Sequence, residues 1–413
     1  MRIIILNNFF SGTAYYCFKF REYRLFWIAA FFSNIGMWSL VYGRLWLMRT
    51  LTESEIFLGL VLTANLTPIL FFSLFGGILS DKHNRLTILR ITRLFFAIFT
   101  LITGILIHLD LIEPIYVIAL SIITGTLLAI DIPARSAMIA RIIPKEHLPN
   151  GIILYSIIFG GSAIIGPLIF APIVSVLSIE YLFYLIGFCY FFTVLILLKM
   201  NLRLHISKLE KKISYSRSLI EGFGYIKTQK NILYIIILGV IVGLFSSSFE
   251  ILLPVFTDEV FLGDSRVYST ILLLLGSGGL VGTVILSISG NHFNKLSVLI
   301  FSSICLGLLF VIFSRITNLN IALMIVPFIG LVNVWKGTIN TTVIQTLVEE
   351  NFRGRTMSLQ QWSWGSAALG GLFTGFFAES FSSPFTLLIS GILIIFFSIS
   401  IGILLLSLFS KIK

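Results

Sequence analysis

Residues 232–242 read Ile-Leu-Tyr-Ile-Ile-Ile-Leu-Gly-Val-Ile-Val. Coiled into a helix, this run is apolar on every face, so no side of it suits contact with water. Similar runs recur along the chain, separated by short polar breaks. A helix needs about 20 apolar residues to cross a bilayer core about 30 Å thick. Strands of an outer-membrane barrel would be about 10 residues long and would alternate apolar with polar side chains. The sequence therefore predicts an all-α integral membrane protein.

Composition supports the same class. Of the 413 residues, 57% are hydrophobic and only 11% are charged, whereas a soluble protein of this length needs a larger charged shell. The cysteines Cys17, Cys189 and Cys305 fit no metal-ligand spacing, and two of them lie in apolar runs. We therefore expect no disulfide framework, no metal site and no cofactor.

Twelve segments are long and apolar enough to be transmembrane helices. They cover residues 25–48, 56–79, 86–108, 114–133, 151–175, 180–199, 232–257, 267–289, 296–315, 320–343, 358–378 and 384–408.

The basic residues predict the orientation of these helices. With the N-terminus, the even-numbered loops and the C-terminus in the cytoplasm, most of the 29 lysine and arginine residues lie on the cytoplasmic side. Only Arg49, Arg266 and Arg315 fall on the opposite side. Lysine and arginine mark cytoplasmic loops. We therefore expect a protein of the cell (inner) membrane with both termini in the cytoplasm. The net charge of +11 is then explained by anionic lipid headgroups, without a nucleic-acid partner.

The longest polar stretch, residues 201–231, divides the chain near its middle. It contains Leu219, Ile220, Phe223 and Ile226 at helical spacing, which is typical of an interfacial amphipathic helix. The predicted organisation is an N-terminal six-helix half (1–200), a cytoplasmic linker (201–231) and a C-terminal six-helix half (232–413).

The two halves contain matching strings. Residues 84–89 (Asn-Arg-Leu-Thr-Ile-Leu) match 294–299 (Asn-Lys-Leu-Ser-Val-Leu), and Gly-Ser-Ala occurs at both 161–163 and 365–367. Both matches are separated by about half the chain. Two six-helix repeats in parallel are the construction of one class of secondary transporter, in which the substrate binds between the halves.

The segment Gly77-Ile-Leu-Ser-Asp-Lys-His-Asn-Arg85 resembles the Gly-x-Leu-Ala-Asp-Arg-x-Gly-Arg motif between helices 2 and 3 of the major facilitator superfamily. Asn84 replaces the usual Gly, and Lys82 replaces the usual Arg. The strings at 20–24, 33–36, 131–135 and 353–358 resemble those of the branch that includes the enterobactin exporters and the macrolide efflux pumps. The resemblance covers nearly the whole chain from residue 20 and implies the twelve-helix major facilitator fold.

The resemblance also implies a cytoplasmic gate. Its candidate residues are Gly77, Asp81, Arg85, Asp131, Arg135, Arg353 and Arg355. The Asp81 carboxylate can accept from free helical N–H groups and pair with a neighbouring arginine. Alternatively, the basic side chains of this loop only anchor it to lipid headgroups, and Asp131 and Arg135, four residues apart, pair with each other.

Small residues on the helices predict close helix packing. Gly76 and Gly77 are candidates in the second helix. Gly166-Pro167 resembles a Gly-Pro motif of proton-driven exporters, although Phe170 stands where that motif carries a further glycine. Gly370 and Gly371 occupy the corresponding place in the second half.

Three ionisable residues are expected to be embedded in the membrane, away from the cytoplasmic helix ends: Arg44, Glu250 and Lys336. Such groups are costly in a bilayer and normally face a cavity or a partner. They fall on helices 1, 7 and 10, which line the central cavity in the family, and none falls on helices 3, 6, 9 or 12. Asn333 and Asn340 share a helical stripe with Lys336. The alternative for Arg44 is that it snorkels to the outer interface.

These features predict a secondary active transporter that exports a small organic solute by alternating access, with protons as the coupling ion. Excess positive charge in the cavity favours an anionic, siderophore-like solute. We expect a monomer in the bilayer. An importer of a nutrient or metal chelate is the alternative on the same fold. A membrane-embedded enzyme is less favoured, because no catalytic cluster or nucleotide-binding loop occurs.

Overall fold

The computed structural model describes residues 15–410, apart from 202–223, 225–226, 290–293 and 349–361. Helices make up nearly all of the described chain. Twelve of them are long, and each coincides with one of the twelve segments expected from the sequence. The expected all-α fold is confirmed.

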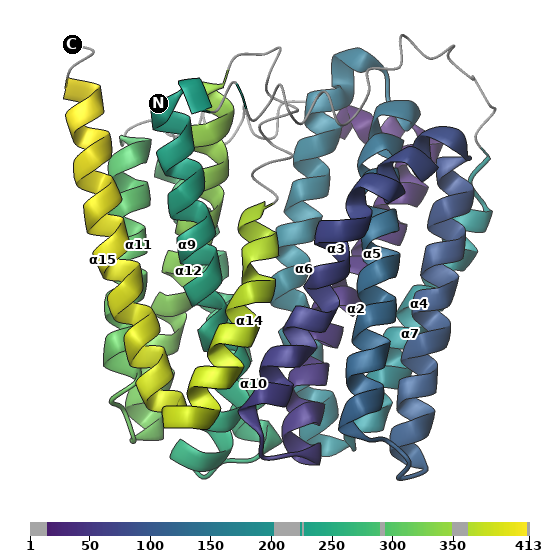
Figure 1. The fold of residues 1–413 in the computed structure, drawn as a ribbon. Helices are drawn as coiled ribbons and strands as arrows, with labels where there is room; N and C mark the ends of the chain where they lie inside the picture. Colours follow the sequence, from purple (N-terminus) through teal and green to yellow (C-terminus); the bar gives the residue numbers. More distant parts are fainter. Residues whose placement is uncertain (1–14, 202–223, 225–226, 290–293, 349–361, 411–413) are drawn as a thin grey trace. The chain divides into compact units, whose positions relative to one another are not determined.

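Figure 1 shows the helices as two bundles of rods that run side by side within each bundle. In chain order the long helices are α2 (Arg21–Leu51), α3 (Glu55–Lys82), α4 (Arg85–His108), α5 (Pro114–Ile142), α6 (Leu148–Val176), α7 (Ile179–Leu198), α9 (Lys230–Val255), α10 (Ser265–Ser289), α11 (Lys295–Phe313), α12 (Leu319–Leu347), α14 (Trp362–Phe381) and α15 (Ser383–Ser410). The turn η1 (Tyr15–Lys19) precedes α2, η2 (Lys145–His147) precedes α6, and α9 continues as the π-helical turn η3 (Phe256–Val260).

Asparagine caps fix the starts of the repeat-related helices α4 and α11. The Asn84 side chain accepts a hydrogen bond from the Leu86 N–H at 3.0 Å, and Asn294 accepts from Leu296 at the same distance. Asn is a favoured N-cap because its side-chain oxygen satisfies one of the free N–H groups of the first turn. The two matching strings therefore build the same local structure.

Helix α5 is longer than expected. The sequence predicts an end near residue 133, yet the helix continues through Pro133 to Ile142. Proline removes one helical hydrogen bond, but membrane helices tolerate it where neighbouring helices enclose the backbone. As a result Asp131 and Arg135 lie within the bundle rather than at a helix end.

The chain divides into two compact units. The N-terminal unit comprises Met1–Gly43 and Pro68–Lys208, and the C-terminal unit comprises Arg44–Thr67 and Leu209–Lys413. The segment Arg44–Thr67 therefore packs with the second unit, although it precedes the linker in sequence. Division into halves at 201–231 stays a prediction, since most of that linker lies outside the described residues.

In the N-terminal unit, α4 and α7 lie side by side (Figure 1). Glycines at the contact make this possible: a Cβ on Gly104 would come within 2.8 Å of the Tyr184 ring, and one on Gly187 within 2.6 Å of Leu101. The same principle holds in the C-terminal unit, where Gly278 of α10 faces the backbone of Pro327 and Gly330 of α12 faces that of Leu275. Small residues let membrane helices approach to backbone contact.

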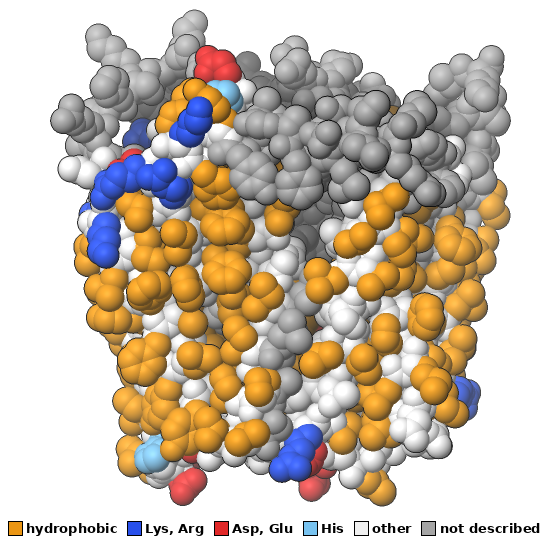
Figure 2. Space-filling model, turned by 180° about the vertical axis from the view of Figure 1, so that it is seen from behind, with side chains coloured by type: hydrophobic (Ala, Val, Ile, Leu, Met, Phe, Trp, Pro, Cys, Tyr) orange, Lys and Arg blue, Asp and Glu red, His pale blue; other side chains and the backbone are white. Residues whose placement is uncertain are grey.

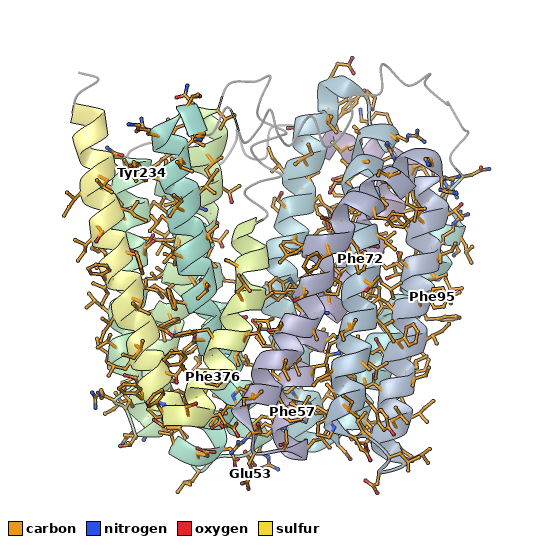
Figure 3. The ribbon with its side chains drawn as sticks, in the orientation of Figure 1. Glu53, Phe57, Phe72, Phe95, Tyr234 and Phe376 are labelled. Carbon is orange, nitrogen blue, oxygen red and sulfur yellow. The ribbon has the colours of Figure 1, made fainter. Side chains whose placement is uncertain are left out.

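The surface suits a bilayer. Figure 2 shows hydrophobic side chains over the middle of the helices and charged side chains toward their ends. Among the outward-facing aromatic residues are Phe95 of α4 and Phe376 of α14, both labelled in Figure 3. By length and composition alone, ten helical segments in the described chain could cross a membrane. The protein is accordingly a multi-pass membrane protein.

Candidate functional site

A cavity of about 120 Å³ lies within the C-terminal unit, between α9, α11 and α12. Helix α12 contributes its polar lining, Lys336, Asn340 and Thr341, and α11 contributes Ser303. Gly243 and Gly337 also line it, and a Cβ added to Gly337 would meet no atom within 4 Å. Glycine at these positions leaves room beside the lysine.

The hydrogen-bonding groups of the cavity are incompletely satisfied by the protein. Lys336 Nζ donates to Ser246 Oγ at 3.1 Å, its one hydrogen bond to the residues that the structure describes. Asn340, one helical turn further along α12, is 7% exposed, and its Oδ1 has no hydrogen-bond partner in the described chain. An ammonium group has three donors, so the pair can bind a ligand that presents both acceptors and a donor.

Two of the five residues that the sequence proposed, Lys336 and Asn340, line this cavity, whereas Glu250 and Asn333 are absent from its lining. Glu250 lies half-buried on α9, where its charge interacts with that of Lys336. Arg44 is buried in the protein, with 3% of its surface exposed, and its part in the cavity stays a prediction.

Sequence reasoning missed Ser303 of α11 and Thr341 of α12. Helix α11 is the ninth in the predicted order, a position that the family resemblance assigns to the lipid-facing side. Serine and threonine are also common in membrane helices as packing residues. Nothing in the sequence pattern therefore distinguished these two hydroxyls.

A second group of polar residues, the buried charge cluster, consists of Arg93, Asp131 and Arg135 in the N-terminal unit. Arg93 donates to Asp131 Oδ2 at 2.6 Å, and Thr92 donates to Oδ1 at 3.0 Å. Arg135 is farther away, 3.7 Å from the same carboxylate. The Asp131 side chain is 0% exposed.

The alternative in which Asp131 and Arg135 pair with each other is consistent with their ion pair at 3.7 Å, but a second, shorter ion pair joins Asp131 to Arg93. The expectation that no embedded charge lies on the third helix is wrong, because Arg93 of α4 is buried. Packing of α4 against α5 turns Arg93 inward, which the position of a residue near a helix start does not reveal.

Arg135 lies among side chains of two further helices. Its Nη1 donates to Asn34 Oδ1 of α2 at 3.4 Å, and its guanidinium carbon is 5.5 Å from the ring centre of Tyr155 on α6. The Asn34 Nδ2 and the Tyr155 hydroxyl have no hydrogen-bond partner within the described part of the chain. The group thus holds one carboxylate and two guanidinium groups in a site sealed from water.

The predicted cytoplasmic gate is described only in part. Arg353 and Arg355 lie outside the described residues, as does the side chain of Asp81 at the end of α3. Arg85 donates to the carbonyls of Ser80 at 3.3 Å and Ala137 at 3.0 Å, and so joins the ends of α3 and α5. A guanidinium that binds backbone carbonyls holds helix ends together, beyond any attraction to lipid.

The C-terminal end of α2 carries an ion pair to η3. Arg49 donates to Asp258 Oδ2 at 2.9 Å and to Glu259 Oε1 at 2.6 Å, and both carboxylates belong to η3. It also donates to the carbonyl of Glu53, which Figure 3 labels at this end of the molecule. Arg49 is two residues before the end of α2, and Asp258 is two residues before the end of η3. Equivalent places in the two repeats therefore carry opposite charges and pair with each other.

Neighbouring contacts of the same segment also belong to the C-terminal unit. Trp46 stacks on Tyr268 of α10, Ser54 donates to Glu379 of α14 at 2.8 Å, and Thr63 donates to the Ala368 carbonyl at 2.7 Å. Together with the ion pair, these contacts join Arg44–Thr67 to η3, α10 and α14.

The predicted packing glycines Gly166, Gly370 and Gly371 all lie at close helix contacts. A Cβ on Gly166 would lie 2.9 Å from Trp38 Cβ, and one on Gly371 would lie 2.6 Å from the Gly59 carbonyl. A Cβ on Gly370 would overlap the Leu244 carbonyl. The Pro167 side chain lies outside the description.

Two adjacent glycines of α3 differ. Gly76 packs against the backbone of Ala129 on α5, whereas Gly77 has no atom within 4 Å of an added Cβ. The expectation that Gly77 permits close helix approach is therefore wrong, and the contact falls on the other face of α3.

Solved transporter structures share this fold. The chain superimposes on a bacterial homologue of the human lysosomal transporter Spinster, in an inward-facing and occupied conformation, with a TM-score of 0.73 at 13% identity, covering 95% of this chain and 98% of that one. It also matches a D-xylose–proton symporter with a TM-score of 0.71 at 12% identity, covering 92% and 96%. At these identities the likeness establishes the fold alone.

Two curated relatives are similar in sequence. The staphyloferrin A transporter of Staphylococcus aureus is 28% identical over 89% of this chain and 92% of its own length. Macrolide efflux protein A of Enterococcus faecalis is 22% identical over 73% of this chain and 95% of its own. The family model described as "Transmembrane secretion effector" matches residues 12–410. The chain therefore belongs to the transmembrane secretion effector family and is a membrane transporter of the major facilitator type.

Proposed function

We propose that this transporter exports a small carboxylate-bearing organic solute by alternating access, driven by proton antiport. The observation that carries the proposal is the cavity of the C-terminal unit, where a half-buried lysine and an unsatisfied amide oxygen lie one turn apart. A buried cation stabilises an anion where water cannot compete, and it disfavours lipophilic cations.

The two curated relatives differ in how well their named solutes fit an anionic substrate. One is named for staphyloferrin A and the other for macrolide efflux. A siderophore that carries carboxylates fits both the first relative and the charge of Lys336. A cationic macrolide fits the second relative only, so the two solute classes can be separated by charge.

The first test replaces the cavity lysine. In inside-out vesicles with a pH gradient, Lys336→Gln is expected to lower uptake of an anionic chelator such as staphyloferrin A at least about tenfold, because loss of a charge-assisted hydrogen bond costs about 1.5–3 kcal/mol. Uptake into inside-out vesicles corresponds to export from cells. Initial rates with the labelled chelator provide the measurement.

Lys230→Gln is the matched control, since Lys230 is exposed at the start of α9. Its rate should equal that of wild type. Strong competition by cationic dyes, with none by anionic chelators, would contradict the proposed substrate class. Uptake only into right-side-out vesicles would reverse the direction.

Coupling to protons is assigned to Glu250, a half-buried carboxyl on α9. Glu250→Gln replaces the carboxyl with an amide that cannot bind and release a proton. We expect this change to abolish substrate-dependent proton flux in proteoliposomes. A pH-sensitive dye trapped inside measures this flux. Glu113→Gln, an exposed residue before α5, serves as control. Unchanged flux in the Glu250 variant would assign coupling to another carboxyl.

The proposed topology has both termini in the cytoplasm. We expect a cysteine at Asp264 to react with an impermeant maleimide in intact cells, and one at Glu146 to react only after lysis. Both positions are exposed. The native Cys17 interferes little, because it is buried and burial raises the pKa of its thiol, which slows thiolate formation. Cys189 and Cys305 are replaced by serine. Labelling of both introduced cysteines from outside would refute the topology.

A further inference from the structure

We propose a second anion-binding site in the N-terminal unit, formed by Arg135, Asn34 and Tyr155, which takes a carboxylate of the transported solute. As a binding site for that solute it rests on the proposed function. It gives Arg135, which the sequence assigns to a cytoplasmic gate, a direct part in binding.

The charge balance of the buried charge cluster is the first argument. The Asp131 carboxylate accepts hydrogen bonds from Arg93 at 2.6 Å and from Thr92 at 3.0 Å. Its Oδ2 is 3.7 Å from the Arg135 guanidinium, beyond hydrogen-bond distance. One carboxylate therefore faces two guanidinium groups. The Arg135 side chain is 9% exposed, so water does not neutralise its charge. Two buried guanidinium groups share one carboxylate, and a bound anion would balance the excess positive charge.

Unused donors around Arg135 are the second argument. A guanidinium has five N–H donors, and Arg135 makes one hydrogen bond to the described residues, at the long distance of 3.4 Å. The Nδ2 of Asn34, a residue that is 0% exposed, has no acceptor in the described chain, and the same holds for the buried Tyr155 hydroxyl. Every one of these groups donates, so an acceptor-only anion satisfies them together.

The position of these side chains is the third argument. They come from α2, α5 and α6, and Trp38, one turn beyond Asn34, packs against Phe159, one turn beyond Tyr155. The Trp38 Nε1 also lacks a partner among the described residues. Aromatic rings next to the donors can pack on the apolar part of an organic acid. The donors and rings together fit an organic carboxylate better than an inorganic ion.

Arg135→Gln provides the test. Binding of radiolabelled citrate, a tricarboxylate probe, is measured by equilibrium dialysis at constant ionic strength on the full-length protein in zwitterionic lipid nanodiscs. Wild type should bind two citrate ions, one in each unit. Arg135→Gln should lose one of them and keep the other, and Lys336→Gln should do the converse. Arg141→Gln, an exposed arginine on the same helix, should bind like wild type.

Asp131→Asn supplies a signature that a merely structural arginine would not give. Because this change removes the internal carboxylate and leaves both guanidinium groups free, it should raise the affinity of the N-terminal site about tenfold, which equals about 1.4 kcal/mol. Arg135→Lys, which keeps the charge, should retain measurable binding and controls for misfolding.

The outcomes separate the two proposals. If Arg135→Gln binds two citrate ions, or Asp131→Asn gains no affinity, the second site is refuted while the cavity at Lys336 stands. If Lys336→Gln leaves binding unchanged and Arg135→Gln removes it, the proposed cavity fails and the N-terminal site stands. Absence of saturable citrate binding in wild type refutes both.

Discussion

Charge reversal at Arg49 is expected to reduce transport at least about tenfold, and a second reversal at Asp258 should restore most of it. The Arg49 guanidinium is 5% exposed, whereas the Asp258 and Glu259 carboxylates are about half exposed. Arg49→Glu places three carboxylates together and destabilises the arrangement in which the pair forms by about 1–3 kcal/mol, less than loss of a fully buried pair would, because water screens the acids. Asp258→Arg in that background recreates the pair in the opposite sense.

Charge reversal is expected to reduce transport because the Arg49–Asp258 pair joins two helical elements. Arg49 joins the end of α2 to η3, next to the contacts of Trp46 and Ser54. In the proposed alternating-access cycle, such contacts form in one state and break in the other, so loss of the pair favours the state without it. The state that holds the pair is then depleted about tenfold for each 1.4 kcal/mol that is lost.

Accessibility of Thr257 measures this shift directly. Thr257 is 0% exposed in η3, so a cysteine there should react with an impermeant maleimide slowly in wild type and at least several-fold faster with Arg49→Glu. Arg266→Glu alters an exposed arginine of α10 and should change neither labelling nor transport. Full transport by the Arg49→Glu single variant would show that the pair has no part in the cycle.

Gly76→Ala and Gly77→Ala are expected to act in opposite directions, although the two residues are adjacent. A Cβ on Gly76 overlaps the Ala129 carbonyl and lies 2.8 Å from Ile130 Cα, so α3 and α5 must separate. Overpacking of this kind costs about 1–3 kcal/mol. Gly77 has open space around it, and alanine there gains up to about 1 kcal/mol through its helix propensity.

Thermal unfolding in detergent, followed by the fraction of monodisperse protein, compares the two variants. The apparent Tm of Gly76→Ala should fall by several degrees, and that of Gly77→Ala should equal or exceed the wild-type value. Equal losses in both variants would mean that the glycines matter through helix flexibility rather than through the α3–α5 contact. Transport should follow the same order, because the contact positions the helix that carries Asp131.

The sequence by itself determined the class, the number of helices and their approximate limits. Runs such as 232–242 leave a membrane helix as the one stable solution, since each buried N–H and C=O must be bonded within its own segment. Local sequence also sets helix starts: the matching strings at 84–89 and 294–299 each begin with an asparagine that caps its helix. Family membership could be read from short motifs, because these depend on residue identity and order.

Partners in space could be decided only by the tertiary structure. Asp131 makes its shorter ion pair with Arg93 of the neighbouring helix and a longer one with Arg135, and Gly76 rather than Gly77 carries the helix contact. Spacing along one helix places residues on a face but gives no information on which neighbouring helix that face meets, or at what depth. The pairing of Arg49 with Asp258 likewise joins residues about 200 positions apart. Such contacts arise from the rotation and approach of whole helices, which the side chains of both partners set together.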